Sequence, residues 1–460
     1  MNIYYGTSGF RFPVPIMKSI AFAIGQATCL LAHQHKQPIG IMITASHNPH
    51  TDNGVKLVQH NGSMLNAEDE QFMVDRVRNP SNIALNTRKT TLIIGMDTRP
   101  SSEMLKKLII RGIRSVDASP IIVDIGWATT PQLHYYTVCK GNRIKNDYIA
   151  TYFSHVKTLE YPHVVVDCAN GVGTFPMRQI VETHELQNNI LLQNTNMSEA
   201  TLLNHLCGSD HVCNHLDPGL FQMDHVLHAS LDGDADRLVC YLREKDHCML
   251  LDGDYISALF AYYFYKCENV KGLRVGVIHT AYSNTSFLSF IHSLGFETQC
   301  TATGVKHLHR AAQNYDIGIY FESNGHGTVL FKDTVASPLK QWLNPHIGDG
   351  VADLFAVLFV LQELDISPKQ WFQLFQKMPS KTYKIYVKDK SIFTTIKDET
   401  RLITPNTLQR NLDNIMKNGC RIFIRPSGTE NVVRLHIEGR HMIDIEDAKS
   451  LVRFHMREFT

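Results

Sequence analysis

The stretch Pro38-Ile39-Gly40-Ile41-Met42-Ile43-Thr44-Ala45-Ser46-His47-Asn48-Pro49 decides how the first part of the chain folds. Residues 38–45 form an apolar run with several β-branched side chains, which predicts a short buried strand. Pro49 and the Asp52-Asn53-Gly54 turn end it, so Ser46 stands where a strand gives way to a loop. Reactive side chains of α/β proteins commonly occupy such positions. The stretch alone also fits an ordinary turn held by local side-chain hydrogen bonds.

Strand and helix patterns alternate outward from this stretch. In the first part we expect helices over 14–33, 67–78 and 101–115 and strands over 91–96 and 121–124. Similar alternation starts again near Tyr161 and near Asp254, whereas strands over 383–387, 421–424 and 432–438 dominate the C-terminal part. The alternation predicts a parallel sheet flanked by helices. For the whole chain we expect the α/β class, with three mixed α/β sheets flanked by helices and a smaller α+β domain at the end.

Length and composition limit the possible functions. A chain of 460 residues is too long for one core and is expected to form several domains. Its 45 basic and 44 acidic residues give a net charge of +1, which indicates neither nucleic acid nor an anionic membrane as a partner. We find no signal-peptide pattern and no run of 18 apolar residues, and the ten cysteines lack a CxxC pair. These features predict a cytoplasmic protein.

Three aspartates suggest a metal site. Asp232, Asp234 and Asp236 are spaced by two, so in an extended segment their carboxylates would project to one side. Each bare pair about 4 Å apart would repel by on the order of 4 kcal/mol at an effective dielectric of about 20, and a divalent cation removes that cost. Oxygen-only ligation with room for a phosphate oxygen favours magnesium, and Arg237 adds a neighbouring cation. A solvated acidic turn is the alternative interpretation.

An anion-binding sequence follows near the C-terminus. Arg425-Pro426-Ser427-Gly428-Thr429-Glu430 combines a guanidinium, two hydroxyls and a flexible glycine, and Arg434 follows on the next predicted strand. A guanidinium binds phosphate oxygens bidentately, and successive backbone N–H groups around a glycine can turn toward an anion. No Gly-Lys-Ser/Thr is present, so a nucleoside triphosphate is not implied.

Polar residues also follow the predicted strand 317–321. Glu322, Asn324 and His326 provide an acceptor, an amide and a titratable imidazole, a combination that suits sugar hydroxyls and proton transfer near neutral pH. Lys56 and Lys306 are further cations, and the sequence alone favours solvated surface lysines at both positions.

Together, these stretches resemble the α-D-phosphohexomutase superfamily. Its members carry a phosphoserine loop, a magnesium loop, a sugar-binding loop and a phosphate-binding loop, one in each of four domains, and the matching stretches here are 44–49, 232–237, 322–328 and 425–430. Stretches 52–57, 129–134, 303–309 and 324–328 resemble the acetylglucosamine branch, and Asn324 replaces the serine usual in glucose and mannose enzymes. Met96 departs from the pattern, because relatives commonly carry arginine there.

The resemblance implies an isomerase that interconverts N-acetylglucosamine 6-phosphate and N-acetylglucosamine 1-phosphate, a step toward UDP-N-acetylglucosamine. Phosphate on Ser46 would pass through a sugar 1,6-bisphosphate, which also serves as activator. One Mg2+ per chain would be held by Ser46, Asp232, Asp234 and Asp236. The catalytic residues implied are Ser46, Arg237, His326, Lys56, Arg11 and His47, with His326 and Lys56 as alternatives for the proton relay. The substrate-binding residues implied are Glu322, Ser323, Asn324, Lys306, Arg425, Ser427, Gly428, Thr429 and Arg434.

The resemblance also implies four domains around a central cleft. We expect a phosphoserine-loop domain (1–147), a magnesium-loop domain (148–248), a sugar-binding-loop domain (249–366), a linker (367–379) and a phosphate-binding domain (380–460). The expected partner is a small sugar phosphate, with no nucleic acid, membrane or obligate protein partner. The alternatives are a phosphoglucomutase or phosphomannomutase of the same superfamily, a serine-dependent magnesium phosphatase, and a sugar-phosphate-binding protein without activity.

Overall fold

The computed structural model describes residues 3–6, 9–80, 89–140, 147–160, 163–215, 223, 226–245, 247–427 and 432–460. The chain forms two compact units. The first consists of Met1–Gly253, Asn324–Thr328 and Ser337–Pro368, and the second of Asp254–Ser323, Val329–Ala336 and Lys369–Thr460.

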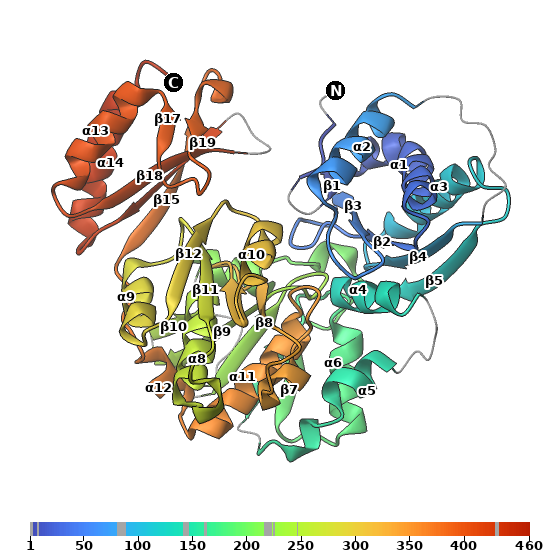
Figure 1. The fold of residues 1–460 in the computed structure, drawn as a ribbon, viewed down its shortest axis with the longest axis horizontal. Coiled ribbons are helices and arrows are strands. Elements are labelled where there is room, and N and C mark those ends of the chain that lie inside the picture. The colour runs from blue at the N-terminus through green and yellow to red at the C-terminus, as the bar shows by residue number, and fades with distance from the viewer. Residues whose placement is uncertain are drawn as a thin grey trace. The chain divides into compact units, whose positions relative to one another are not determined.

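The first sheet of the first unit has the strand order β1-β3-β2-β4-β5 (Figure 1). Its strands are β1 (Phe10–Pro13), β2 (Ile39–Ile43), β3 (Asp52–Val58), β4 (Thr91–Met96) and β5 (Ile121–Trp127). β2, β4 and β5 are parallel, whereas β3 pairs antiparallel with β1 and β2. All five residues of β2 are buried, as expected for a central strand covered on both faces. The predicted strand before Ser46 is therefore confirmed.

Four helices cover this sheet. They are α1 (Val14–His35), α2 (Ala67–Arg78), α3 (Ser102–Arg114) and α4 (Thr130–Val138). α1 packs against α2 and α3, and α4 packs against β2, β3 and β4. Among the described residues, α1 is the one helix long and apolar enough to cross a membrane, but half of its most apolar window is buried, which is typical of a core helix.

The second sheet of the first unit has the order β10-β9-β8-β6-β7. Its strands are β6 (Val164–Asp167), β7 (Ile190–Gln193), β8 (Leu227–Leu231), β9 (Leu238–Glu244) and β10 (His247–Leu251). β6, β7 and β8 are parallel, and β9 is antiparallel to β8 and β10. The helices α6 (Thr174–Thr183), α7 (Gly208–His215) and α11 (Gly350–Leu364) pack against this sheet, and α5 (Asp147–Phe153) packs against α6.

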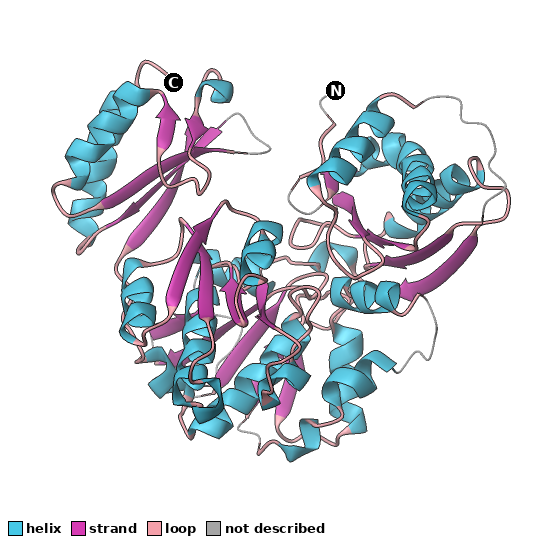
Figure 2. Cartoon of the chain, in the orientation of Figure 1, coloured by secondary structure: helices cyan, strands magenta, loops and turns pink. Residues whose placement is uncertain are grey.

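The second unit contains a further α/β sheet and a smaller antiparallel one (Figure 2). The α/β sheet consists of β11 (Val275–Thr280), β12 (Glu297–Thr301), β13 (Ile317–Phe321) and β14 (Gly327–Phe331), with helices α8 (Gly253–Lys266), α9 (Thr285–Ser293) and α10 (Val305–Ala312). The C-terminal sheet consists of β15 (Ser380–Tyr386), β18 (Arg421–Pro426) and β19 (Val432–Glu438), with helices α13 (Asn406–Met416) and α14 (Met442–Met456). A two-stranded hairpin, β16 (Thr394–Thr395) and β17 (Leu402–Thr404), packs against β18, and α12 (Pro368–Phe372) precedes β15.

The observed elements confirm the predicted fold class, three mixed α/β sheets followed by a smaller α+β part. The predicted domain boundaries stay a prediction. Ser101 precedes α3 but makes no side-chain capping hydrogen bond. Its hydroxyl instead accepts a hydrogen bond from Asn53 Nδ2 at 2.8 Å, which ties α3 to β3.

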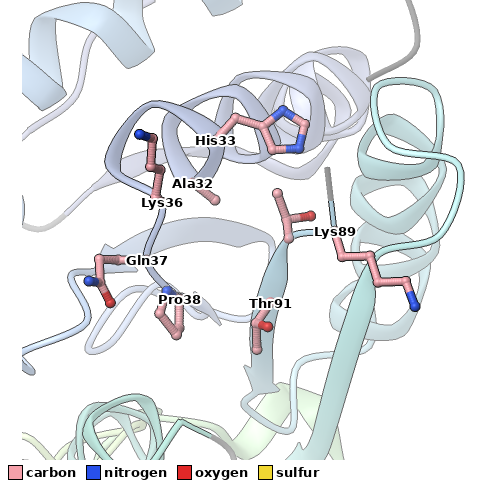
Figure 3. Close-up of a pocket in the computed structure, with 8 residues that line it drawn as sticks. Ala32, His33, Lys36, Gln37, Pro38, Lys89 and Thr91 are labelled. Carbon is pink, nitrogen blue, oxygen red and sulfur yellow. The ribbon is translucent and has the colours of Figure 1, made fainter. Parts of the chain in front are cut away.

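A cavity of about 370 Å3 lies beside the amino-terminal ends of β2 and β4 (Figure 3). His33, Lys36, Lys89 and Thr90 are among its lining residues. Nearby, the buried Asp117 carboxylate accepts hydrogen bonds from the backbone and hydroxyl of Thr90, both at 2.8 Å. Ser46 follows the carboxyl end of β2, whereas this cavity lies at the amino-terminal ends of the strands.

Candidate active site

The loop that carries Ser46 is held by a buried arginine. Arg99 follows the carboxyl end of β4, the parallel neighbour of β2, and its side chain is 0% exposed. Its guanidinium donates to four backbone carbonyl oxygens, those of Ser46 (2.8 Å), Asn48 (2.7 Å), Pro49 (2.5 Å) and Asp52 (3.0 Å). Asp97 Oδ2 accepts from Arg99 Nε and from Thr44 Oγ1, both at 2.8 Å. The loop is thus fixed through its main chain.

Ser46 points into the cluster of aspartates. Its Oγ donates to Asp232 Oδ2 at 2.6 Å and lies 3.5 Å from Nδ1 of His47. The backbone of Ser46 is left-handed, with φ 53°, which is uncommon for a residue other than glycine. A Cβ at Gly233 would lie only 2.6 Å from the carbonyl oxygen of Ser46, so glycine is what lets the two loops approach this closely.

Asp232, Asp234 and Asp236 come together as predicted, but the expected conformation was wrong. They lie in a turn between β8 and β9, and Ala235 is left-handed with φ 56°, so the segment is not extended. One carboxylate oxygen from each aspartate lies within 4.8 Å of the other two. All three side chains are buried.

Lys56 is part of this cluster rather than a solvated surface lysine. Its Nζ donates to Asp234 Oδ2 at 2.6 Å and to Asp236 Oδ2 at 2.7 Å. Burial opposes the charge of Lys56, but the two carboxylates outweigh it and raise the pKa of the ammonium group. Thr130 also donates its hydroxyl to Asp234 Oδ2 at 2.5 Å.

The negative charge of this cluster, and its carboxylate oxygens that lack a hydrogen-bond partner among the described residues, fit a divalent cation. Burial, together with Asp236 and Asp234, raises the pKa of Asp232 well above its ordinary value, because Arg237 and the hydrogen bond from Ser46 offset these effects only in part. Among the described residues, Oδ1 of Asp234 and Oδ1 of Asp236 are buried and have no hydrogen-bond partner. Three hard oxygen ligands that lack full compensation are the donor set that magnesium prefers.

The other cations and imidazoles predicted for this part also lie close by. Arg237 Nε is 3.7 Å from Asp232 Oδ2, and His326 Nε2 is 3.9 Å from Asp236 Oδ2. Arg11 donates to Asn48 Oδ1 at 3.2 Å. Burial, together with Arg237 and Arg11, lowers the pKa of His47, so its imidazole is neutral in this environment. The six predicted catalytic residues therefore all lie in the first unit, on the Ser46 loop, near it or near the aspartates.

The predicted phosphate-binding arginines lie on neighbouring strands of the second unit. Arg425 on β18 pairs with Arg434 on β19 in the sheet register. Nε of Arg434 is buried and lacks a hydrogen-bond partner among the described residues, which suits an anion site. Ser427 is buried, and its carbonyl accepts from Lys390 Nζ at 2.8 Å. The predicted residues Gly428 and Thr429 lie outside the described residues.

The predicted sugar-binding residues fall on both units. In the second unit, Glu322 Oε1 accepts from the backbone N–H of Gly304 at 2.9 Å; Ser323 follows it, and Lys306 lies on α10. In the first unit, Asn324 Oδ1 accepts from the backbone N–H of His326 at 3.0 Å. Asn324 and His326 therefore belong to the turn that follows β13 in the sequence.

Three residues of the first-unit site were not predicted. Arg99 could have been found, because it follows a strand expected to be parallel to β2, and the carboxyl ends of parallel strands meet at one edge. Thr130 could have been found too, since it lies in a stretch already singled out. Asn204 donates from Nδ2 to the carbonyl of Ser46 at 2.9 Å, and no pattern in the sequence indicates it.

Three family models match the chain. Residues 252–344 match phosphoacetylglucosamine mutase AMG1, domain III. Residues 19–84 and 80–144 match the phosphoglucomutase/phosphomannomutase alpha/beta/alpha domain I, and residues 384–447 match the phosphoglucomutase/phosphomannomutase C-terminal domain. A strand-end serine, a buried aspartate cluster and paired C-terminal arginines on this series of sheets define the class of α-D-phosphohexomutases.

Relatives that match nearly the whole chain show which family within this class the chain belongs to. The human phosphoacetylglucosamine mutase is 34% identical, over 95% of this chain and 90% of its own length. A solved N-acetylglucosamine-phosphate mutase of the α-D-phosphohexomutase superfamily, in its product complex, is 33% identical with a TM-score of 0.90, over 98% of this chain and 96% of that one. The Aspergillus fumigatus N-acetylphosphoglucosamine mutase, solved with GlcNAc-6P and magnesium, is 30% identical with a TM-score of 0.90, over 100% and 96%. The chain belongs to the phosphoacetylglucosamine mutase family.

Proposed function

We propose that this chain is a phosphoacetylglucosamine mutase, an isomerase that interconverts N-acetylglucosamine 6-phosphate and N-acetylglucosamine 1-phosphate. The observation that carries the proposal is the hydrogen bond of Ser46 to Asp232 within a buried cluster of three aspartates. A hydroxyl held at such a cluster can carry a phosphoryl group and pass it on. The reaction runs through a sugar 1,6-bisphosphate, which also activates the enzyme, and is a step toward UDP-N-acetylglucosamine.

Each group of the first-unit site has a separate task in this reaction. Asp232, Asp234, Asp236 and Ser46 hold one Mg2+, which neutralises charge on the transferring phosphoryl group. Arg99 and Asn204 fix the serine through its carbonyl oxygen. Arg237, Arg11 and His47 line the phosphoserine, and His326 or Lys56 moves the proton of the attacking sugar hydroxyl.

Substrate binding is assigned to the predicted phosphate-binding and sugar-binding residues. Arg425, Ser427, Gly428, Thr429 and Arg434 grip the phosphate that is not transferred, and Glu322, Ser323, Asn324 and Lys306 bind the sugar. The bisphosphate has to present each of its phosphates to Ser46 in turn, so both ends of the sugar use the same anion site. We assign these residues to the four predicted domains, with boundaries at 147, 248, 366 and 379.

The experiment is a mutase assay on the phosphates of N-acetylglucosamine, glucose and mannose, run side by side with added sugar bisphosphate. We expect the fastest turnover on N-acetylglucosamine phosphate and nearly complete loss of turnover in Ser46→Ala, which should still bind substrate. Near-normal turnover in that variant would sink the assignment of Ser46. Fastest turnover on glucose or mannose phosphate would favour the related mutases, and steady release of inorganic phosphate would favour a phosphatase.

The state of the cysteines supports a cytoplasmic location. All ten cysteines are free thiols, which suits the reducing cytoplasm. The partner is a small sugar phosphate, and we propose that the enzyme needs no nucleic acid, membrane or obligate protein partner.

A further inference from the structure

Glu399 joins two loops of the second unit that the proposed function uses. It lies in the turn between β16 and β17. Its Oε1 accepts a hydrogen bond from Arg425 Nη1 at 3.2 Å. Its Oε2 accepts from Thr303 twice, from the backbone N–H at 3.0 Å and from the hydroxyl at 2.6 Å. One carboxylate therefore links the phosphate-binding arginine to the turn before α10.

The Thr303 turn is itself tied to the sugar-binding loop. The next residue, Gly304, donates its backbone N–H to Glu322 Oε1 at 2.9 Å. Glu399 thus holds Thr303, and the neighbouring residue Gly304 holds Glu322, a proposed sugar-binding residue. A shift of Glu399 would disturb both the phosphate contact and the sugar contact.

Arg425 has a second fixed partner. Its Nε donates to the hydroxyl of Tyr282 at 2.9 Å, and its guanidinium carbon lies 5.6 Å from the centre of that ring. Because a guanidinium is planar, donors fixed at Nε and Nη1 define its plane and direct its remaining N–H groups. The Arg425 and Glu399 side chains are only 16% and 20% exposed, so water screens their ion pair less than a surface pair.

The backbone of Glu399 supports a specific role for its carboxylate. Its φ is 63°, in the left-handed region that residues other than glycine rarely adopt. Such a conformation persists where the surroundings over-determine it, commonly at functional sites. The turn is closed by hydrogen bonds from Glu399 N–H to Ile396 O and from Ile396 N–H to Arg401 O, both at 3.0 Å.

We propose that Glu399 is a positioning residue for the mutase reaction. It orients the guanidinium of Arg425 toward the substrate's phosphate and couples that anchor, through Thr303 and Gly304, to the sugar-binding Glu322. The inference rests on the proposed function, since it assigns the orienting partner of that same phosphate site.

The test compares Glu399→Gln with the wild type. Glutamine keeps an acceptor for Thr303 but loses the charge that holds Arg425. We expect the KM for N-acetylglucosamine 6-phosphate to rise about tenfold, which corresponds to about 1.4 kcal/mol, with kcat falling less than about threefold. The chemistry at Ser46 should change little, because Glu399 acts on binding. An unchanged KM would overturn the inference, and so would a lower KM, which would mean that the carboxylate competes with the substrate's phosphate.

Two further variants separate positioning from simple loss of structure. Asp413→Asn removes the partner of Arg401, which lies in the same hairpin and donates to Asp413 Oδ2 at 2.7 Å without contacting Arg425. Its KM should stay within about twofold of the wild type. In an Arg425→Gln background, adding Glu399→Gln should weaken substrate binding, measured by calorimetry, by less than about twofold more. Fully additive losses, or an equal rise of KM in Asp413→Asn, would contradict a role through Arg425.

These outcomes are distinguishable from failure of the proposed function. A wild-type enzyme that does not turn over N-acetylglucosamine phosphates would refute the function. Calorimetry of N-acetylglucosamine 6-phosphate binding to the wild type and to Glu399→Gln would still test Glu399, and equal affinities would overturn the inference.

Discussion

Replacing Arg99 with lysine should loosen the Ser46 loop without removing any of the reacting groups. Arg99 is fully buried and donates to four carbonyl oxygens of the loop as well as to Asp97. A lysine keeps the positive charge beside Asp97 but has three donors on a single atom, so it cannot reproduce a planar fork that spans four carbonyls.

The size of the effect follows from the bonds that are lost. Lysine would leave at least two of the five acceptors without this donor, and hydrogen bonds to charged groups contribute about 1.5–3 kcal/mol each. The loop should therefore lose about 3–6 kcal/mol of local stability. A displacement of the reacting atom by about 1 Å can cost about 100-fold in rate, so we expect kcat to fall by about that factor.

The assay measures kcat of Arg99→Lys in the mutase reaction, with phosphorylation of Ser46 followed by intact mass. The control is Arg274→Lys, whose exposed arginine pairs with Glu297 and whose kcat should stay within about twofold. If Arg99→Lys kept kcat within about threefold of the wild type, the claim that this arginine positions the serine would be refuted.

Two more predictions concern the first unit. Gly233→Ala should lower kcat by about 100-fold, because its Cβ would lie 2.6 Å from the carbonyl oxygen of Ser46; wild-type activity would show that the loops can separate without cost. Burial raises the pKa of Asp349 to about 6 from 3.8, so its contribution to stability is complete below pH 3.8 and is lost as the pH rises through 6. The stability of Asp349→Asn relative to wild type, measured by urea denaturation, should therefore increase by about 2.4 kcal/mol between about pH 4 and pH 7, and a constant difference would contradict this.

Much of the fold could be predicted from periodicity. The strands 91–96 and 317–321 and the helix 67–78 have the predicted bounds, because uninterrupted apolar runs and amphipathic repeats are local signals. Other elements gave weaker signals. β12 is Glu-Thr-Gln-Cys-Thr, with too few apolar residues to be recognised, and it is a strand because β11 pairs with it.

The parts of the candidate site that could be predicted are those whose functional residues lie together in one short stretch of sequence. The aspartates, Arg425 and Ser46 stood out by residue type and spacing, although the extended conformation expected for Asp232–Asp236 was wrong, because Ala235 turns the chain. Partners contributed by distant segments gave little signal. Asn204 reaches Ser46 across 158 positions, and Glu399 reaches Thr303 across 96, so only the folded chain brings them together.

The way Arg99 grips its loop has a consequence for sequence divergence. Its four contacts with the serine loop, and those of Asn204, end on carbonyl oxygens, which every residue type carries. These backbone contacts therefore do not depend on which side chains stand at 47 and 48, either during evolution or in a designed library. Such a library would vary the side chains that surround Ser46 while keeping the backbone contacts of Arg99 and Asn204, which makes this loop a practical starting point for engineering the site.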